Sequence, residues 1–240
     1  GFLNAVGLPN AGIDNSLGEI EFAMKNAGVP VIPSIFGGTK EEFGMVAEKM
    51  ATLKPQMIEV NLSCPNTAND LGEAFALSEK AAAEVIRIVK SKTKVPIIAK
   101  LAPNVPSIKK IAKAVEEAGA DAISAVNTMP GMAIDVKTGK PILHNKQGGV
   151  SGHAIKPIAV NCVYDIYKTV SIPIIGIGGV TTGEDAVEMI MAGAVAVEIG
   201  TAIYYRGIDV FRKVSDEVKK FMEENGYSTI KEIIGIAHKK

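Results

Sequence analysis

The sequence predicts an α/β protein built on a parallel sheet, and three repeated patterns support this. Short apolar runs alternate with longer amphipathic segments six times along the chain. Pro96 and Pro173 open two of the runs, where a missing N–H harms a strand least. Gly119 and Gly193 stand where helical segments must end before the next strand. Regular alternation of this kind gives parallel strands joined by right-handed crossovers.

The expected elements follow one another without an interdomain linker, so we expect a single domain over residues 1–240. A Gly/Asn-rich lead-in occupies residues 1–18. Strands are expected where Ile and Val dominate, at residues 30–36, 57–62, 96–101, 122–127, 173–177 and 196–199. Helices are expected where apolar residues recur at helical spacing, at residues 19–27, 40–53, 78–92, 107–118, 154–169, 183–192, 209–225 and 229–237.

Six βα units are two fewer than a closed (β/α)₈ TIM barrel requires. We expect such a barrel, with its first two strands upstream of residue 1 in a segment of roughly 60 residues or more. The alternative is an open sheet of six strands.

Composition excludes several classes of function. The chain has 26 basic and 26 acidic residues, a balance that does not favour nucleic acid or an anionic membrane as a partner. Its apolar runs are about ten residues or fewer, too short to span a bilayer. The first residues lack the pattern of a signal peptide, and the chain has 2 Cys. We therefore expect a cytoplasmic protein without a disulfide framework.

Polar and glycine residues collect where the expected strands end, which is the catalytic rim of a barrel. The strand at 57–62 runs directly into Ser63, Cys64, Pro65 and Asn66. A thiol at this position indicates a catalytic residue, although a free Cys is more often a small core hydrophobe. Cys162 lies at a helical position among apolar residues and is expected in the core.

Two glycine motifs, at residues 175–180 and 198–202, predict a phosphate site on the last two strands. Glycines allow backbone N–H groups to approach an anion, and a following helix capped by Thr181 or Thr182 would add a favourable dipole. The alternative is that both motifs are tight turns only. The three His residues, His144, His153 and His238, lack the spacing of metal ligands, so no metal site is expected.

Lys100 and the pair Asn127–Thr128 are further candidates. Lys100 lies inside an apolar run, and a buried ammonium requires an anionic or electron-rich partner. A ligand could be that partner, or an acid on a neighbouring strand could form a salt bridge. Asn127 and Thr128 offer amide and hydroxyl groups to a planar polar ligand, or they could simply cap a turn.

Together these motifs resemble the class 1 dihydroorotate dehydrogenase family, the FMN enzymes of pyrimidine synthesis, over most of the chain. The resemblance extends from Asn4 to about Thr201 and is closest to subclass 1B at residues 131–135 and 148–152. The motifs that carry it are residues 4–8, 61–66, 100–104, 127–128, 131–135, 148–152, 155–157, 178–179 and 200–201.

The resemblance implies a (β/α)₈ barrel that holds FMN and oxidises dihydroorotate to orotate. Cys64 would be the general base that removes the C5 proton, while hydride leaves C6 for N5 of FMN. The implied substrate contacts are Asn4, Ala5, Val6, Gly7, Leu8, Asn61, Asn66, Asn127 and Thr128. The implied FMN contacts are Ser34, Asn61, Lys100, Val126, Gly152, Gly178, Gly179, Gly200 and Thr201. Ser34 stands where the family often carries Asn, so the resemblance does not decide whether Ser34 contacts FMN.

Subclass 1B further implies a partner subunit with FAD and a [2Fe–2S] cluster, and a homodimer core within a heterotetramer. The loop at residues 65–76 resembles a lid. The electron acceptor is not indicated by any residue. Competing functions are another FMN-dependent pyrimidine reductase, of the dihydropyrimidine dehydrogenase or dihydrouridine synthase type, a flavin-free phosphate-binding barrel enzyme, and a non-catalytic remnant.

Overall fold

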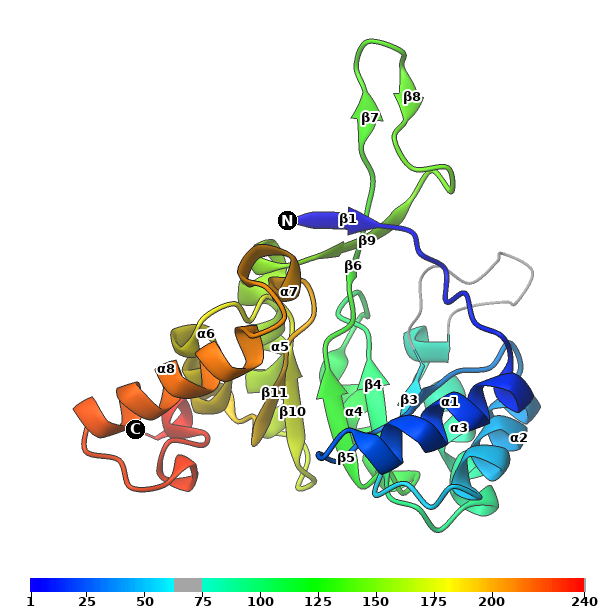
Figure 1. Ribbon diagram of the computed structural model, residues 1–240, viewed down its shortest axis with the longest axis horizontal. Helices are drawn as coiled ribbons and strands as arrows, with labels where there is room; N and C mark the ends of the chain where they lie inside the picture. Colours follow the sequence, from blue (N-terminus) through cyan, green and yellow to red (C-terminus); the bar gives the residue numbers. More distant parts are fainter. Residues whose placement is uncertain (63–74, 240) are drawn as a thin grey trace.

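A computed structural model of the chain describes residues 1–62 and 75–239. Its main feature is a six-stranded parallel sheet in the order β11-β10-β5-β4-β3-β2 (Figure 1). The strands are β2 (Ser34–Ile35), β3 (Ile58–Asn61), β4 (Ile97–Leu101), β5 (Ala122–Ala125), β10 (Ile174–Ile177) and β11 (Ala196–Glu198). All six expected strands are therefore confirmed, although several are shorter than expected.

The order of the strands identifies the kind of α/β fold. Within the described residues the order across the sheet follows the chain from β2 to β11, without the reversal that defines a doubly wound sheet. The covering helices pack against one another in the same succession, α2 to α6 and then α8. Consecutive strands inside consecutive helices are the arrangement of a (β/α) barrel. In the part of the chain described, β11 and β2 are the two edges of the sheet, which is not closed.

Most helices begin and end close to the expected positions, and α7 was not expected. They are α1 (Ile13–Asn26), α2 (Lys40–Ala51), α3 (Glu79–Lys92), α4 (Ile108–Glu117), α5 (Lys156–Tyr167), α6 (Gly183–Ala192), α7 (Ala202–Arg206) and α8 (Val210–Glu224). In Figure 1, α1, α2 and α3 lie at the β2 end of the sheet, and α6 and α8 lie at the β11 end. None of the described helices is both long and apolar enough to cross a membrane.

Two expectations for helices are corrected. The helix expected at 19–27 begins earlier, at Ile13, within the stretch assigned to the lead-in. The helix expected at 229–237 is wrong: two short 3₁₀ helices, η4 (Ile230–Glu232) and η5 (Ile236–His238), are found instead. Gly235 between them has φ 66°, a left-handed conformation that ends a helix.

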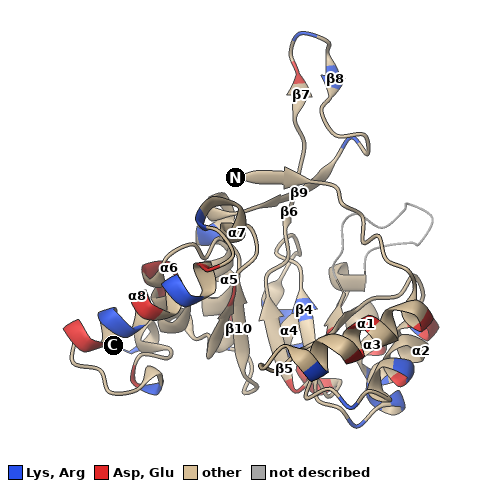
Figure 2. Ribbon diagram, viewed as in Figure 1, with Lys and Arg blue, Asp and Glu red and all other residues tan. Residues whose placement is uncertain are grey.

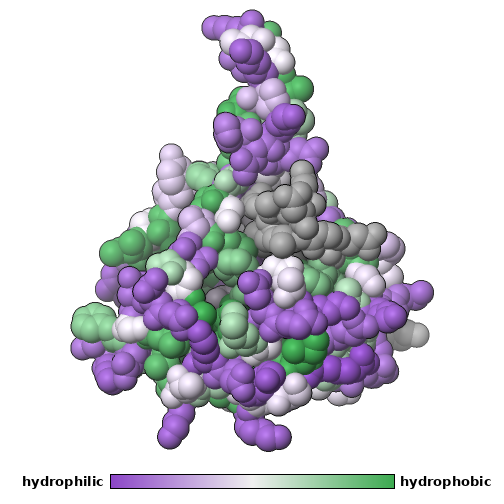
Figure 3. All heavy atoms as spheres, turned by 90° about the vertical axis from the view of Figure 1, so that its right-hand side faces the viewer, coloured by the Kyte–Doolittle hydropathy of each residue, from purple (hydrophilic) through white to green (hydrophobic). Residues whose placement is uncertain are grey.

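A second, smaller sheet lies over one end of the main sheet and was not expected. Its order is β1-β9-β6, from β1 (Phe2–Asn4), β9 (Gly148–Ser151) and β6 (Met129–Gly131). Between β6 and β9 the chain extends outward as an arm with strands β7 (Ile134–Asp135) and β8 (Lys140–Pro141) (Figure 1). Figure 3 shows polar and apolar side chains mixed on this arm.

The core lies on both faces of the main sheet, as apolar strands without polar alternation require. The largest fully buried side chains are Phe43, Ile58, Val60, Ile86, Ile97, Ile98, Leu101, Ile123, Ile166, Ile174, Met189 and Ile233. Figure 2 shows that charged residues of both signs are distributed over the outer helices.

Ile123 in β5 provides a test of this packing. Ile123 is 0% exposed, so Ile123→Ala should lower the free energy of unfolding by about 2–5 kcal/mol through lost burial and a residual cavity. The matched control is Ile134→Ala on the arm, where the side chain is 54% exposed and the change should stay within about 0.5 kcal/mol. Denaturant unfolding measures both, and equal losses would contradict the assigned core.

Candidate active site

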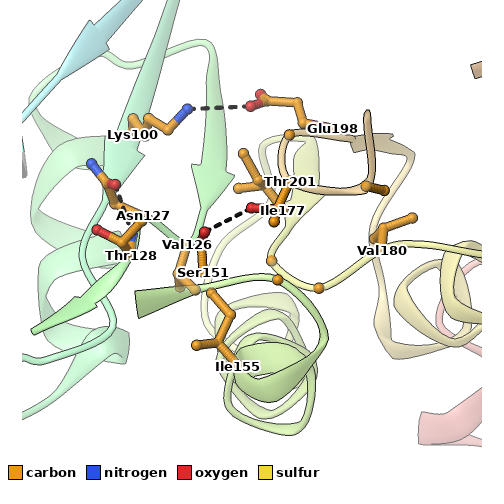
Figure 4. A pocket seen from close by; sticks show the side chains of 15 residues that line it. Lys100, Val126, Asn127, Thr128, Ser151, Ile155, Ile177, Val180, Glu198 and Thr201 are labelled. Atoms are coloured by element: carbon orange, nitrogen blue, oxygen red, sulfur yellow. Dashed lines mark hydrogen bonds and ion pairs between the residues drawn. The ribbon is translucent and has the colours of Figure 1, made fainter. Parts of the chain in front are cut away.

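A cavity of about 210 Å³ opens at the carboxyl ends of the main strands (Figure 4). It is lined by Lys100, Val126, Asn127, Thr128, Ser151, Gly152, Ile155, Ile177, Gly178, Gly179, Val180, Glu198, Gly200, Thr201 and Ala202. Nine of these are residues that the sequence predicted: Lys100, Val126, Asn127, Thr128, Gly152, Gly178, Gly179, Gly200 and Thr201. The predicted rim therefore brings these nine residues to one cavity, which is where barrel enzymes place their chemistry.

Lys100 is held between two carboxylates. Its Nζ lies 3.2 Å from Glu59 Oε1 on β3 and 3.2 Å from Glu198 Oε2 on β11. The Glu59 carboxylate also accepts hydrogen bonds from Ser34 Oγ at 2.7 Å and Ser124 Oγ at 2.8 Å. The salt bridge to a neighbouring strand, left open as the alternative for Lys100, is thus present, and the Lys100 side chain also lines the cavity.

These contacts change the pKa values of the cluster. Burial disfavours the ammonium of Lys100, but Glu59 and then Glu198 outweigh burial and raise its pKa above the usual value. Burial raises the pKa of Glu198, with Glu59 adding to the effect and Lys100 opposing it. Lys100 is therefore charged throughout the physiological range, and Glu198 is the acid that is easier to protonate than usual.

The register of the sheet explains why the cluster forms. Lys100 stands opposite Asn61 of β3 and Ser124 of β5. Glu59 is two residues before Asn61, and alternate residues of a strand share a face. Sequence reasoning missed Glu59, Ser124, Ser151 and Glu198 as site residues. A charged Glu59 within a buried apolar strand was the available signal.

The turn after β10 lies directly over α5. Gly178 and Gly179 have φ of 127° and 78°, which favour glycine. A Cβ on Gly178 would lie 2.7 Å from Ala159 Cβ, and one on Gly179 would lie 2.6 Å from Lys156 Cβ. Glycine at both positions is therefore required by packing as well as by backbone conformation.

The N-terminus of α6 is occupied by protein carboxylates, which corrects its expected part in anion binding. Thr182 caps the helix as expected, and Asp185 accepts from the N–H groups of Thr181 and Thr182 at 2.9 Å. Glu217 accepts from the Gly183 N–H at 2.6 Å. The N–H groups of Thr181, Thr182 and Gly183 are thus already bonded, and an anion in the cavity would rely on other donors.

Donors at the other side of the cavity fit that purpose. The hydroxyls of Ser151 and Thr201 lie 2.7 Å apart. Nothing lies within 4 Å of the position that a Cβ on Gly200 would take, so the backbone there is open on that side. Two hydroxyls and an accessible glycine backbone form a donor set suited to a phosphate group.

Asn61 and Asn127 connect this cavity to the end of β3. Asn127 Nδ2 donates to Asn61 Oδ1 at 3.2 Å, and Asn127 Oδ1 accepts from the Thr128 N–H at 2.7 Å. A Cβ on Gly149 of β9 would collide with the Thr128 hydroxyl, so glycine allows the small sheet to lie against Thr128. Asn61 itself is not among the residues that line the cavity.

Other predicted residues lie elsewhere. Ser34 donates a hydrogen bond to Glu59 of the Lys100 cluster and does not line the cavity. In the segment Asn4–Leu8, Asn4 lies on β1 and donates to the Gly149 carbonyl at 3.3 Å, whereas Val6 is 70% exposed. Ala5, Gly7 and Leu8 do not line the cavity either. Cys64, Asn66 and most of the lid expected at 65–76 lie outside the described residues.

Cys162 and the His residues take no part in the cavity. Cys162 is buried in the core as expected, and burial, with Asp165 adding to it, raises the pKa of its thiol to about 11. His153 is exposed and lies 3.9 Å from Asp185. In the part of the chain that the structure describes, no group of three or more His, Cys, Asp or Glu could hold a metal ion.

Comparisons with known proteins agree with this geometry. The family model described as dihydroorotate dehydrogenase matches residues 1–222. The relative from Methanosarcina acetivorans, named dihydroorotate dehydrogenase B (NAD(+)), catalytic subunit, is 49% identical over 238 residues, which are 99% of this chain and 76% of the relative. The protein of the same name from Pyrococcus abyssi is 48% identical over 239 residues, 100% of this chain and 79% of the relative.

A solved structure supports the fold independently. The crystal structure of DHODH from Eimeria tenella in complex with ferulenol superposes with a TM-score of 0.82 at 23% identity, covering 99% of this chain and 72% of that chain. The fold and the names of the relatives together define an α/β barrel-type oxidoreductase, and its candidate site lies at the carboxyl ends of the strands. The chain belongs to the dihydroorotate dehydrogenase family, whose members are flavin-dependent. It spans about three quarters of the relatives, whose name as catalytic subunits implies an electron-transfer partner.

Asp185 provides a test of the scaffold of the site. Burial opposes its ionisation, but hydrogen bonds from Lys156, Thr182 and Thr181 outweigh burial and lower its pKa below the ordinary 3.8. A lowered carboxyl pKa stabilises the fold above the unfolded value, and the stabilisation is lost as pH falls through the folded value. Asp185→Asn should therefore cost about 2–3 kcal/mol at neutral pH, and less as pH falls from about 5 to 2.

Glu188→Gln is the matched control, because Glu188 pairs with the same Lys156 at 2.7 Å but is 48% exposed. Its cost should be less than about 1 kcal/mol. Urea unfolding across this pH range measures both variants. A loss for Asp185→Asn that does not depend on pH would contradict the assigned ion pair.

Proposed function

We propose that this chain oxidises dihydroorotate to orotate in pyrimidine biosynthesis, with FMN as its cofactor and Cys64 as the general base. The observation that carries the proposal is the cavity that gathers Lys100, Asn127, Thr128 and both glycine turns in a member of this family. The names of the relatives supply the substrate, and the donor set of the cavity supports the cofactor.

The described residues suit both ends of FMN, the phosphate and the flavin ring. Ser151, Thr201 and the Gly200 backbone would hold the phosphate, because they offer hydroxyl and backbone donors on an open side of the cavity. Lys100 and Val126 would contact the flavin ring, where a fixed ammonium suits an edge that gains electron density. FMN would supply the acceptor for the hydride.

The residues of the chain would supply orientation and proton transfer. Asn127, bonded to Asn61, would present amide groups to the planar substrate, with Thr128 beside it. Cys64 would remove the C5 proton as a thiolate, which requires a pKa tuned toward the working pH. Apolar Val126, Ile155 and Ile177 on the cavity wall would help to exclude water.

We also infer that the protein works with a second subunit. The relatives named catalytic subunits support a partner subunit, and the resemblance to subclass 1B would give that partner FAD and a [2Fe–2S] cluster. For the assembly, we propose a heterotetramer built around a homodimer of this chain. For the location, we propose the cytoplasm.

An anaerobic visible spectrum tests the cofactor and the substrate together. The purified protein should show flavin bands that bleach when dihydroorotate is added and do not bleach with dihydrouracil. Cys64→Ser should retain the flavin bands but reduce the rate of bleaching by about 10²-fold or more, because general base catalysis is lost. Bleaching by dihydrouracil would indicate another pyrimidine reductase, and a colourless protein would contradict the flavin proposal.

Thr201→Val tests the phosphate end of the cavity. The substitution keeps the side-chain shape but removes a hydroxyl that would bond a charged group, worth about 1.5–3 kcal/mol. FMN affinity should therefore fall by about tenfold or more, measured by quenching of flavin fluorescence. The control is Thr138→Val on the exposed arm, which should leave the affinity unchanged. Equal affinities for the two variants would place the phosphate elsewhere.

A further inference from the structure

The two carboxylates on Lys100 differ in how firmly they are held. Glu59 is only 8% exposed and receives Ser34 Oγ and Ser124 Oγ, one on each oxygen, in addition to Lys100. Glu59 Oε1 and Oε2 lie 3.2 Å and 3.4 Å from Lys100 Nζ. Both oxygens of the Glu59 carboxylate are therefore held by donors from the protein.

Glu198 has a different environment. Its Oε2 contacts Lys100 Nζ at 3.2 Å, its side chain is 31% exposed, and it lines the cavity, which Glu59 does not (Figure 4). It is also two residues before Gly200. Glu198 is therefore the acid of the cluster that a ligand in the cavity can reach.

The charged groups that face Glu198 in the described part of the chain are Lys100 from β4 and Glu59 from β3. The side of β11 that faces α8 meets Phe211, Val214 and Ser215, which do not titrate in this range. The single Lys100 ammonium thus contacts two carboxylates, and these three groups carry a net charge of −1 when both carboxylates are ionised. Burial and Glu59 raise the pKa of Glu198.

A ligand that gains negative charge beside Lys100 would increase this imbalance. Like charges brought together in a partly buried site favour protonation of the group whose charged form is held least firmly. Among the described residues Glu59 accepts from three donors, whereas Glu198 has the ammonium that the ligand would also use and the neighbouring Glu59 carboxyl group. The geometry therefore distinguishes Glu59, which is fixed by protein donors, from Glu198, which would share its ammonium with the ligand.

We propose that Glu198 takes up a proton when reduction of the bound cofactor adds negative charge beside Lys100. This inference rests on FMN as the cofactor. In the coupled step an O–H bond forms between a Glu198 carboxylate oxygen and a proton from solvent. The two electrons come from dihydroorotate, and the proton returns to solvent on reoxidation. Lys100 remains an ammonium in both states.

The test is the number of protons taken up per two electrons by FMN in the holoprotein. This number follows from the pH dependence of the midpoint potential, measured with redox mediators between about pH 6 and 9. The unaltered protein should take up two protons over part of this range, and Glu198→Gln should take up one, a loss of the proton assigned to Glu198. Glu184→Gln, an exposed acid on α6, is the matched control and should keep the two-proton value.

A second measurement has a readout on the unaltered protein that holds even where the variant fails to fold. Reduced-minus-oxidised infrared spectra of the unaltered protein should gain a protonated-carboxyl band, and Glu198→Gln should lack it. One proton per two electrons in the unaltered protein, two protons in Glu198→Gln, or no carboxyl band would each overturn the inference. Mediators replace dihydroorotate in these titrations, so such results leave the proposed substrate and cofactor standing. A protein that binds no FMN overturns the cofactor and the inference together.

Discussion

The Lys100 ammonium, inside a largely buried strand, is the constraint on which the rest of the site depends. An unpaired cation at that depth would be strongly unfavourable, so the strands around it must deliver acids. β3 contributes Glu59 and β11 contributes Glu198, while Ser34 on β2 and Ser124 on β5 satisfy Glu59. Five of the six parallel strands therefore meet in one polar cluster. A one-residue slip of β4 would turn Lys100 to the opposite face and separate these groups.

The two ends of the cavity use different kinds of donor, and local backbone geometry separates them. At the Lys100 end, side chains define the chemistry. At the other end, glycine turns and the hydroxyls of Ser151 and Thr201 do so. The N-terminus of α6 stabilises the scaffold between them, because Asp185 and Glu217 already accept from its N–H groups. The helix dipole is thus satisfied within the protein, and the small sheet brings Ser151 to Thr201.

Much of the main sheet could be predicted from sequence, because a buried parallel strand carries a local signal of apolar residues between Gly and Pro. The same local signal located Lys100 and the glycine turns. The small sheet could not be predicted, since β1 and β9 pair across a sequence separation of more than one hundred residues and each is only a few residues long. The roles of Glu59 and Glu198 depend on the same kind of distant contact. The salt bridge between Lys100 on β4 and Glu198 on β11 cannot be predicted from either segment alone, because the two residues are distant in sequence.

Fold and family together indicate which chemistry the chain can perform, but only the site can explain how. At 23% identity the solved structure shares the fold, and a barrel alone is compatible with many reactions. The described site narrows the range of reactions, because a cation that a buried acid holds in place can stabilise added electron density without being reorganised. A second acid on the same cation would weaken that effect if its charge were permanent. A site that both accepts and releases electrons is better served when one of the two acids can lose its charge, and Glu198, at the cavity wall, is in the position to do so.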